Sequence, residues 1–192
     1  MRRIFLSIIA VLAMCSCSST SLRCNFVSAD ISTLEDEHVV LAGFAARDGL
    51  SDGIHIPLRT HALAVTDGQQ KICIISNDLM ELSPSLAGEI RTEISRRSGL
   101  PYDNILLHCI HTHSAPRFGG ASAQPGGTNA TYKERAVEAI IANAVQAISD
   151  EKSYRDFSLE IAKGTTDINR NRCEADGPVD HALYAARLLD RK

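Results

Sequence analysis

Tryptophan is absent from this sequence of 192 residues, and aromatic residues make up only 5% of it. The formal net charge at pH 7 is −3, so there is no excess of positive charge to attract a polyanion. Proteins that bind nucleic acid rely on clustered basic side chains and on aromatic rings that stack against bases. The composition therefore argues against nucleic-acid binding, and we predict no nucleic-acid partner.

The cysteines include no Cys-x-x-Cys pair, which argues against zinc-ribbon and thioredoxin-like sites. Beyond the N-terminal segment there are four: Cys24, Cys73, Cys109 and Cys173. An exported protein can form disulfides, but these four cysteines allow more than one pairing and the sequence does not choose among them. Cys73 and Cys109 lie within apolar runs, which favours buried free thiols at both positions.

The N-terminal residues carry the features of an export signal. Arg2 and Arg3 form a basic start, and the apolar stretch at positions 4–14 is too short to cross a bilayer as a mature helix. The next residues, CSCSSTS, place a cysteine directly after this stretch, which is where bacterial lipoproteins are cleaved and lipidated. We therefore expect an exported lipoprotein, with an ordinary secretory signal as the alternative.

Cys17 is the expected lipidation site, because the small residue Ser16 precedes it. Cys15 follows Met14, which suits a signal peptidase less well. This choice defines residues 1–17 as a lipoprotein-type signal peptide. We expect the lipid anchor to hold the protein on a membrane, in the periplasm or at the outer membrane.

The whole chain has the composition of one globular domain, with 44% apolar and 22% charged residues. We interpret the polar residues 18–37 as a tether and residues 38–192 as the domain. Strands are predicted at 61–66, 71–77, 104–110, 157–168 and 181–190, and helices from Ser83 or Ser85 to 98 and at 132–149. This alternation predicts an α/β fold, a mixed sheet with flanking helices. Leu106 and Ile110 are predicted to be buried in the third strand.

Two histidines follow that third strand directly. In an extended backbone, side chains at positions i and i+2 point to the same side, so His111 and His113 are predicted to present two imidazoles together. Imidazole is a favoured zinc ligand, but a catalytic zinc site needs three protein ligands and an open position. Two loop histidines hydrogen-bonded to the backbone are the alternative. His108 points the other way and is predicted to lie in the core.

Small and polar residues surround the histidine pair. Ser114 and the glycines after it, including Gly119 and Gly120, form a loop in which a substrate can approach the backbone closely. Asn77 and Asp78 end a neighbouring predicted strand, and ligand sites of open α/β sheets gather at such strand ends. This loop is therefore a candidate substrate-binding segment.

Two further segments supply cationic side chains. The stretch GIHIPLR contributes His55 and Arg59, and NRNR contributes Arg170 and Arg172 two positions apart. Two guanidinium groups beside a metal suit a polarised carbonyl or an anionic leaving group. NRNR also fits a solvated turn.

The motifs LAGFAAR, GIHIPLRTHALAV, SNDL, HTHSAP and NRNR, in this order, resemble those of neutral (alkaline, non-lysosomal) ceramidases. The resemblance covers roughly residues 38–190 and is greatest to the short bacterial type. Enzymes of this family use one zinc ion to hydrolyse the amide bond of N-acylsphingosine, a ceramide, to sphingosine and a fatty acid. The resemblance therefore implies Zn²⁺ as cofactor and a ceramide-like lipid amide as substrate.

Carried over residue by residue, the resemblance implies that His111 is a zinc ligand. It implies that His113 lies beside the reacting water and the substrate amide and moves a proton to the leaving amine. Arg172 is implied to stabilise the oxyanion that forms on the scissile carbonyl. Ser114, Gly119, Gly120 and Arg170 are the candidate substrate-binding residues around this centre.

Two departures from the family pattern bear on activity. Ala115 stands where the family commonly has glycine. The other family zinc ligands, a second histidine, a glutamate and a tyrosine, come from further along a longer chain, and His181 belongs to a segment that precedes that second histidine. We therefore expect an incomplete N-terminal portion of a larger catalytic domain, inactive alone.

Two alternatives remain open. One is a small self-sufficient zinc hydrolase, with His55 or Asp78 as the third ligand. The other is an exported lipoprotein that binds lipid or protein without catalysis.

We expect the mature protein to begin at a lipidated cysteine at position 17 and to partition with membranes. The check is an intact-mass measurement of the exported protein, with Cys17→Ala as the variant that leaves Cys15 in place. Cys17→Ala should lose the lipid mass. An unmodified chain cleaved beyond position 17 would contradict the lipoprotein signal.

Overall fold

The computed structural model describes residues 21–44, 47–118 and 130–191. The predicted signal peptide with Cys15 and Cys17, and the loop glycines Gly119 and Gly120, lie outside these residues. Within the described part, neither helix is long and apolar enough to cross a membrane.

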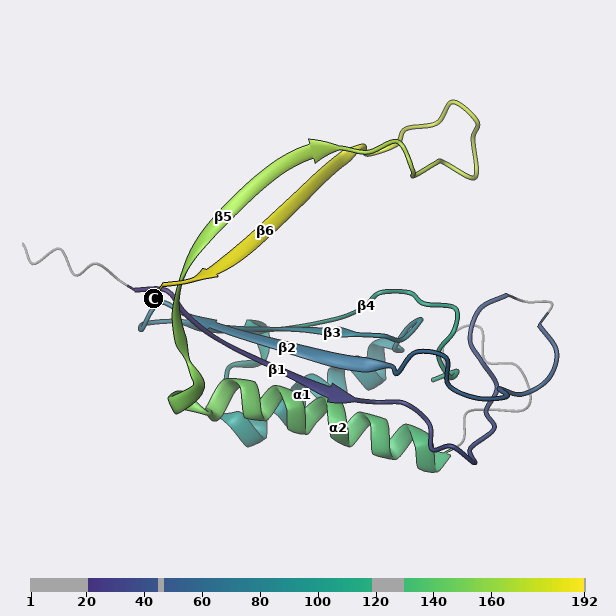
Figure 1. Cartoon of the computed structure of the whole chain (residues 1–192), viewed down its shortest axis with the longest axis horizontal. Coiled ribbons are helices and arrows are strands. Elements are labelled where there is room, and N and C mark those ends of the chain that lie inside the picture. Colours follow the sequence, from purple (N-terminus) through teal and green to yellow (C-terminus); the bar gives the residue numbers. More distant parts are fainter. Residues whose placement is uncertain (1–20, 45–46, 119–129, 192) are drawn as a thin grey trace, which may run out of the picture.

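A six-stranded sheet in the order β4-β3-β2-β1-β5-β6 carries the fold (Figure 1). The strands are β1 (Arg23–Asp30), β2 (Arg59–Thr66), β3 (Lys71–Asn77), β4 (Ile105–Cys109), β5 (Arg155–Thr165) and β6 (Ala182–Asp190). The helices are α1 (Pro84–Ser98) and α2 (Ala130–Ser149), with short 3₁₀ turns η1 (Tyr102–Asn104) and η2 (Glu151–Ser153). Neighbouring strands are antiparallel except β3 and β4, which are parallel. The predicted mixed α/β sheet with flanking helices is confirmed.

The predicted tether at 18–37 is wrong for most of its length, because it contains β1. This strand pairs along its whole length with β2, from Arg23 opposite Thr66 to Asp30 opposite Arg59. The sequence did not indicate this strand, because the strand contains polar side chains. One of them, Asn25, is buried, and its Nδ2 donates to the Ala147 carbonyl of α2 at 3.0 Å. The domain therefore begins well before residue 38.

Helix α1 forms the crossover that makes β3 and β4 parallel. Its start is set by Ser83, whose hydroxyl accepts the backbone N–H of Leu86, and by Pro84 at the first helical position. It ends at Gly99, whose left-handed φ of 76° suits a residue without a Cβ. Both predicted boundaries are confirmed.

Both helices pack on one face of the sheet (Figure 1). The core there is made of alternate strand residues and of one side of each helix: Ala62, Ala64, Cys73, Ile75 and Ile105 from the strands, and Ile90, Ile94, Tyr132, Ile140 and Ala144 from the helices. Tyr132, fully buried, donates its hydroxyl to the Ile31 carbonyl at 2.9 Å. Helix α2 thereby fastens the segment after β1.

The opposite face of the sheet is exposed although it is apolar. Leu106 and Ile110, predicted to be buried, are 50% and 56% exposed, whereas Ile105 is 1% exposed. His108, predicted to lie in the core, is exposed as well. Side chains alternate along β4, so Ile105 and Leu107 face the helices while Leu106 and His108 face away.

Strands β5 and β6 form a long hairpin that arches away from the rest of the sheet (Figure 1). The β1–β5 ladder has two residue pairs, Arg23 with Asp156 and Cys24 with Arg155, and the Phe157 N–H also donates to the Leu22 carbonyl at 3.0 Å. Most hairpin side chains are exposed, including Leu159, Ile161 and Tyr184.

The cysteines of the described part are free thiols. Cys73 is fully buried on the helix side, and this burial raises the pKa of its thiol to about 12. Cys109 is half-buried, and burial raises the pKa of its thiol to about 11. The prediction of free thiols at these two positions is confirmed, and both are expected to be protonated and unreactive near neutral pH.

The alternation along β4 predicts unequal costs for two adjacent truncations. We expect Ile105→Ala to lower the free energy of unfolding by about 2–5 kcal/mol, because it opens a cavity against the helices. Leu106→Ala, on the exposed face, should cost less than about 1 kcal/mol. Urea denaturation of the 192-residue protein gives both values. Equal costs would mean that both faces of β4 are covered in solution.

Candidate functional site

The candidate site begins where β3 and β4 end side by side. The parallel pairing runs to Cys109 opposite Asn77. It continues past the strands, because the N–H of Ile110 donates to the Asn77 carbonyl at 3.1 Å. The next N–H, that of His111, donates to the Leu79 carbonyl, also at 3.1 Å. The HTHSAP and SNDL motifs therefore lie together at the carboxyl edge of these two strands.

Asn77 and Asp78 hold the backbone at this edge. Asn77 is fully buried, and its Nδ2 donates to the His108 carbonyl at 3.0 Å. The Asp78 carboxylate accepts the backbone N–H of Arg59 at 2.9 Å, and its own N–H donates to the Arg59 carbonyl at 2.9 Å. The SNDL motif thus ties β3 to β4 on one side and to β2 on the other.

His111 and His113 lie together, but not through the extended backbone that the sequence suggested. His111 has a positive φ of 63°, in the left-handed region, so the chain turns as soon as β4 ends. The two ring centroids are 5.0 Å apart with their planes at 66°. The predicted proximity is confirmed, and the predicted cause is wrong.

The main chain orients the His111 ring. Its Nδ1 lies 3.0 Å from the carbonyl oxygen of Met80, which can only accept a hydrogen bond. Nδ1 therefore carries the hydrogen, and the lone pair is on Nε2. Metal-binding histidines are commonly oriented by such a bond from the other ring nitrogen. His111 is an exposed residue.

A second loop packs against the histidine loop. The N–H of Ala42 donates to the Ala115 carbonyl at 2.8 Å, and the N–H of Arg117 donates to the Val40 carbonyl at 2.9 Å. Ala115, the departure from the family glycine, is fully buried, so the loop accommodates its methyl group. Leu41, the first residue of LAGFAAR, is therefore paired antiparallel with Pro116, the last residue of HTHSAP.

A pocket of about 490 Å³ adjoins the histidine loop. The loop contributes the alternate residues Ile110, Thr112, Ser114 and Pro116, and neither His111 nor His113 is among the described lining residues. The other walls are mainly apolar: Val39, Leu41, Ile54, Ile56, Pro57 and Leu58, with Ser32, Thr33, Ser51, Gly53, His55 and Asp78. The predicted substrate residue Ser114 thus faces an apolar pocket next to the histidine pair.

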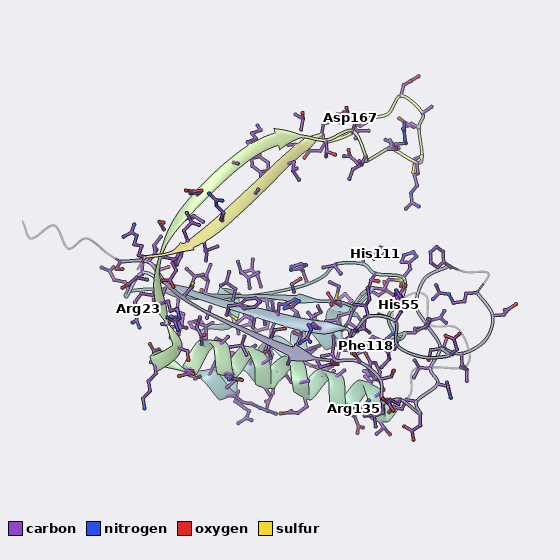
Figure 2. The ribbon with its side chains drawn as sticks, in the orientation of Figure 1. Arg23, His55, His111, Phe118, Arg135 and Asp167 are labelled. Atoms are coloured by element: carbon purple, nitrogen blue, oxygen red, sulfur yellow. The ribbon has the colours of Figure 1, made fainter. Side chains whose placement is uncertain are left out.

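The described residues include two imidazoles that could serve as ligands to a zinc ion. Two imidazoles that meet, one with its lone pair on Nε2, suit zinc as ligands. Figure 2 shows His55 and His111 at the same end of the sheet. In the part of the chain that the structure describes, however, no three His, Cys, Asp or Glu side chains are grouped closely enough to hold a metal ion. His55 and Asp78 therefore do not complete a site with the pair here.

The arginines of NRNR lie elsewhere in the structure. Arg170 and Arg172 are exposed in the loop between β5 and β6. That loop stands apart from the histidine loop, as the positions of Asp167 and His111 show (Figure 2). His181, at the base of the loop, has its Nδ1 2.9 Å from the Thr166 carbonyl.

Sequence reasoning missed the residues that surround His113. The Arg47 guanidinium donates to the His113 carbonyl at 2.9 Å, and the Phe44 ring meets the imidazole edge-on at 4.9 Å. Gly43 has a φ of 75° and lies directly against the same ring. The glycine and arginine of LAGFAAR were the available signal, but only the fold brings them to position 113.

The hydrogen bond from the Asn77 side chain to the His108 carbonyl is expected to stabilise the loop that carries the histidines. We expect Asn77→Ala to lower the free energy of unfolding by about 1–3 kcal/mol, because the His108 carbonyl loses a buried donor. It should also shift the backbone amide signals of residues 110–113 in NMR spectra.

Asn104→Ala is the matched control. Its Nδ2 donates to the Lys71 carbonyl at 2.9 Å, an equivalent bond at the other end of the β3–β4 pair. This variant should cost stability without moving those signals. Equal effects on residues 110–113 would contradict a local role for Asn77.

Comparison with known proteins places these features in one family. The model of the N-terminal region of neutral/alkaline non-lysosomal ceramidases matches residues 26–176. The fold is similar to that of neutral ceramidase from Pseudomonas aeruginosa, with a TM-score of 0.63, 18% identity, and coverage of 89% of this chain and 30% of that one.

A ceramidase solved in complex with C2 gives a TM-score of 0.65 at 20% identity, covering 89% of this chain and 29% of that one. This chain thus spans about 30% of the length of the solved ceramidases that it matches. The family match includes the histidine pair and most of the mixed sheet. The chain therefore belongs to the neutral/alkaline non-lysosomal ceramidase family, as the N-terminal part of the ceramidase domain.

Proposed function

We propose that this chain supplies the first zinc ligand and the proton-transferring histidine of a ceramidase-type amidase. In this proposal the substrate is an N-acylsphingosine, hydrolysed to sphingosine and a fatty acid. The observation that carries it is the meeting of the His111 and His113 rings, 5.0 Å apart, within a chain of this family.

The exposed apolar face of the sheet supports a requirement for more polypeptide. Phe26, Ile72 and Leu106 lie on that face and are 60%, 38% and 50% exposed. A monomer rarely leaves so many large apolar side chains together in water. We propose that polypeptide equivalent to the rest of a ceramidase domain covers this face and supplies the remaining zinc ligands.

The chain's own residues divide the chemistry between them. Zinc, when bound, supplies Lewis acidity that makes water nucleophilic near neutral pH. His111, with Nδ1 held by the Met80 carbonyl, presents Nε2 as a ligand. His113 takes the proton from the attacking water and delivers it to the leaving amine. Arg172 donates to the oxygen of the scissile carbonyl, once the hairpin loop lies over the site.

The pocket beside the histidine loop supports a lipid substrate. Its walls are mainly apolar, and Thr112 and Ser114, from the loop that carries the histidines, are among its polar lining residues. A pocket with apolar walls and a few polar groups is typical of sites that bind and orient small molecules. We propose that an apolar chain of the substrate lies there. Export and an N-terminal lipid anchor, also proposed, would bring the enzyme to such lipids.

The test is reconstitution. We expect the 192-residue chain alone to bind zinc weakly and to leave ceramide intact, because it supplies one proposed zinc ligand, His111, and a catalytic zinc site uses three protein ligands. Added to the C-terminal portion of a related ceramidase, it should gain stoichiometric zinc and amidase activity. His111→Ala should abolish both. His108→Ala, three positions earlier and outside the ring pair, should keep the zinc.

Arg172→Ala separates zinc binding from turnover in the same reconstituted enzyme. It should leave the zinc content unchanged and lower turnover on the order of 10²–10³-fold, as the loss of one oxyanion donor does. Metal analysis and a ceramide hydrolysis assay measure the two quantities. Stoichiometric zinc and activity in the 192-residue chain alone would contradict the proposal, and His55 and Asp78 would then be mutated first.

A further inference from the structure

We infer that Gly43, Phe44 and Arg47 act together as positioning residues that fix the imidazole of His113, an arrangement named here the His113 clamp. The inference rests on the proposed function, because it assigns these residues to the proton transfer proposed for His113. All three belong to the LAGFAAR motif.

The absence of a side chain at Gly43 leaves room for the His113 ring. The φ of Gly43 is 75°, which residues with a Cβ rarely adopt. A Cβ at this position would lie 2.2 Å from Cγ and 2.5 Å from Nδ1 of the His113 ring. Both distances are far shorter than any van der Waals contact, so the ring occupies the space that a side chain at position 43 would need.

Phe44 and Arg47 hold the ring and its backbone from the other sides. The Phe44 ring meets the imidazole at 81° with 4.9 Å between centroids. The Arg47 guanidinium donates to the His113 carbonyl at 2.9 Å and to the Ala42 carbonyl at 3.3 Å. Its central carbon lies 5.0 Å from the centroid of the Phe44 ring, a favourable cation–π distance. Arg47 thus joins the two loops and the aromatic ring.

The clamp acts on His113 and not on His111. The Met80 carbonyl and the Leu79 carbonyl hold His111 from the β3 side. His113 is instead supported by Gly43, Phe44 and Arg47. A general base works only within hydrogen-bond reach of the proton that it moves. A displacement of the His113 ring by about 1 Å should therefore greatly lower the rate of proton transfer. Damage to the clamp should therefore reduce proton transfer while zinc binding persists.

Gly43→Ala and Gly49→Ala form a matched pair for the test. Gly49 lies in the same loop and has a φ of 87°, but a Cβ there meets nothing within 4 Å. The two variants therefore share the backbone strain and differ in the clash with His113. Any difference between them reports the ring contact itself.

The first measurement is NMR of the 192-residue protein with labelled histidine and phenylalanine. Cross-peaks between the ring protons of Phe44 and His113 should be present in the parent and in Gly49→Ala. They should be lost in Gly43→Ala. If they persist in Gly43→Ala at parental intensity, the clamp is wrong, whatever the activity of the reconstituted enzyme.

Arg47→Ala keeps the test decisive if Gly43→Ala does not fold. This variant removes both hydrogen bonds and introduces no clash, so the chain should fold and the same cross-peaks should weaken. Arg47→Lys, which keeps the charge and one donor, should restore part of their intensity. Unchanged cross-peaks in Arg47→Ala would overturn the role of Arg47.

The second measurement uses the reconstituted enzyme. Gly43→Ala should keep its zinc and its KM, and its kcat should fall on the order of 10²-fold relative to Gly49→Ala. A parental kcat with lost cross-peaks would show that the clamp holds the ring but does not serve the reaction, and would overturn the positioning role. Absence of activity in the parent enzyme would contradict the proposed function and leave the NMR result to judge the clamp.

Discussion

The parallel pairing of β3 with β4 is the constraint on which the candidate site depends. It brings two motifs that are far apart in sequence to one edge of the sheet, and its hydrogen bonds continue past both strands to His111. Parallel neighbours require a crossover, which α1 provides with a serine cap at one end and a glycine at the other. A shift of one residue in this register would move His111 away from the Met80 carbonyl that orients its ring.

Local patterns predicted most of the elements, and long-range contacts account for what they missed. The bounds of α1, the strands β2 and β3, and the two strands of the final hairpin were all predicted from the sequence. Strand β1 was not predicted, because it contains polar residues. The buried Asn25 fits there only because its Nδ2 donates to the Ala147 carbonyl of α2, a contact that the fold creates. The histidine pair was predictable as a pair. Its support by Gly43 and Arg47 was not, since no local pattern shows which side chain will meet a distant loop.

The error about Leu106 reflects a property of β4 itself. A short, nearly continuous apolar run is typical of a strand that is covered on both faces. The helices cover one face only, and Leu106 and Ile110 face the other. The sequence of β4 is thus that of an interior strand, in a structure where it is an edge strand with one bare face. This mismatch, together with the exposed hairpin, agrees with a fold that contacts further polypeptide.

Under the proposed function, the left-handed backbone at His111 makes a favourable chain conformation and the zinc ligand compete for one position. Residues with a Cβ pay roughly 1–2 kcal/mol for this conformation, and glycine adopts it without that cost. A change to glycine would therefore relieve the backbone and remove the imidazole at once. Relatives in which the metal chemistry has decayed are then expected to acquire glycine or asparagine at this turn before they lose the fold. If His111 has the proposed role, the residue at position 111 distinguishes relatives that keep only the fold from relatives that also keep the metal chemistry.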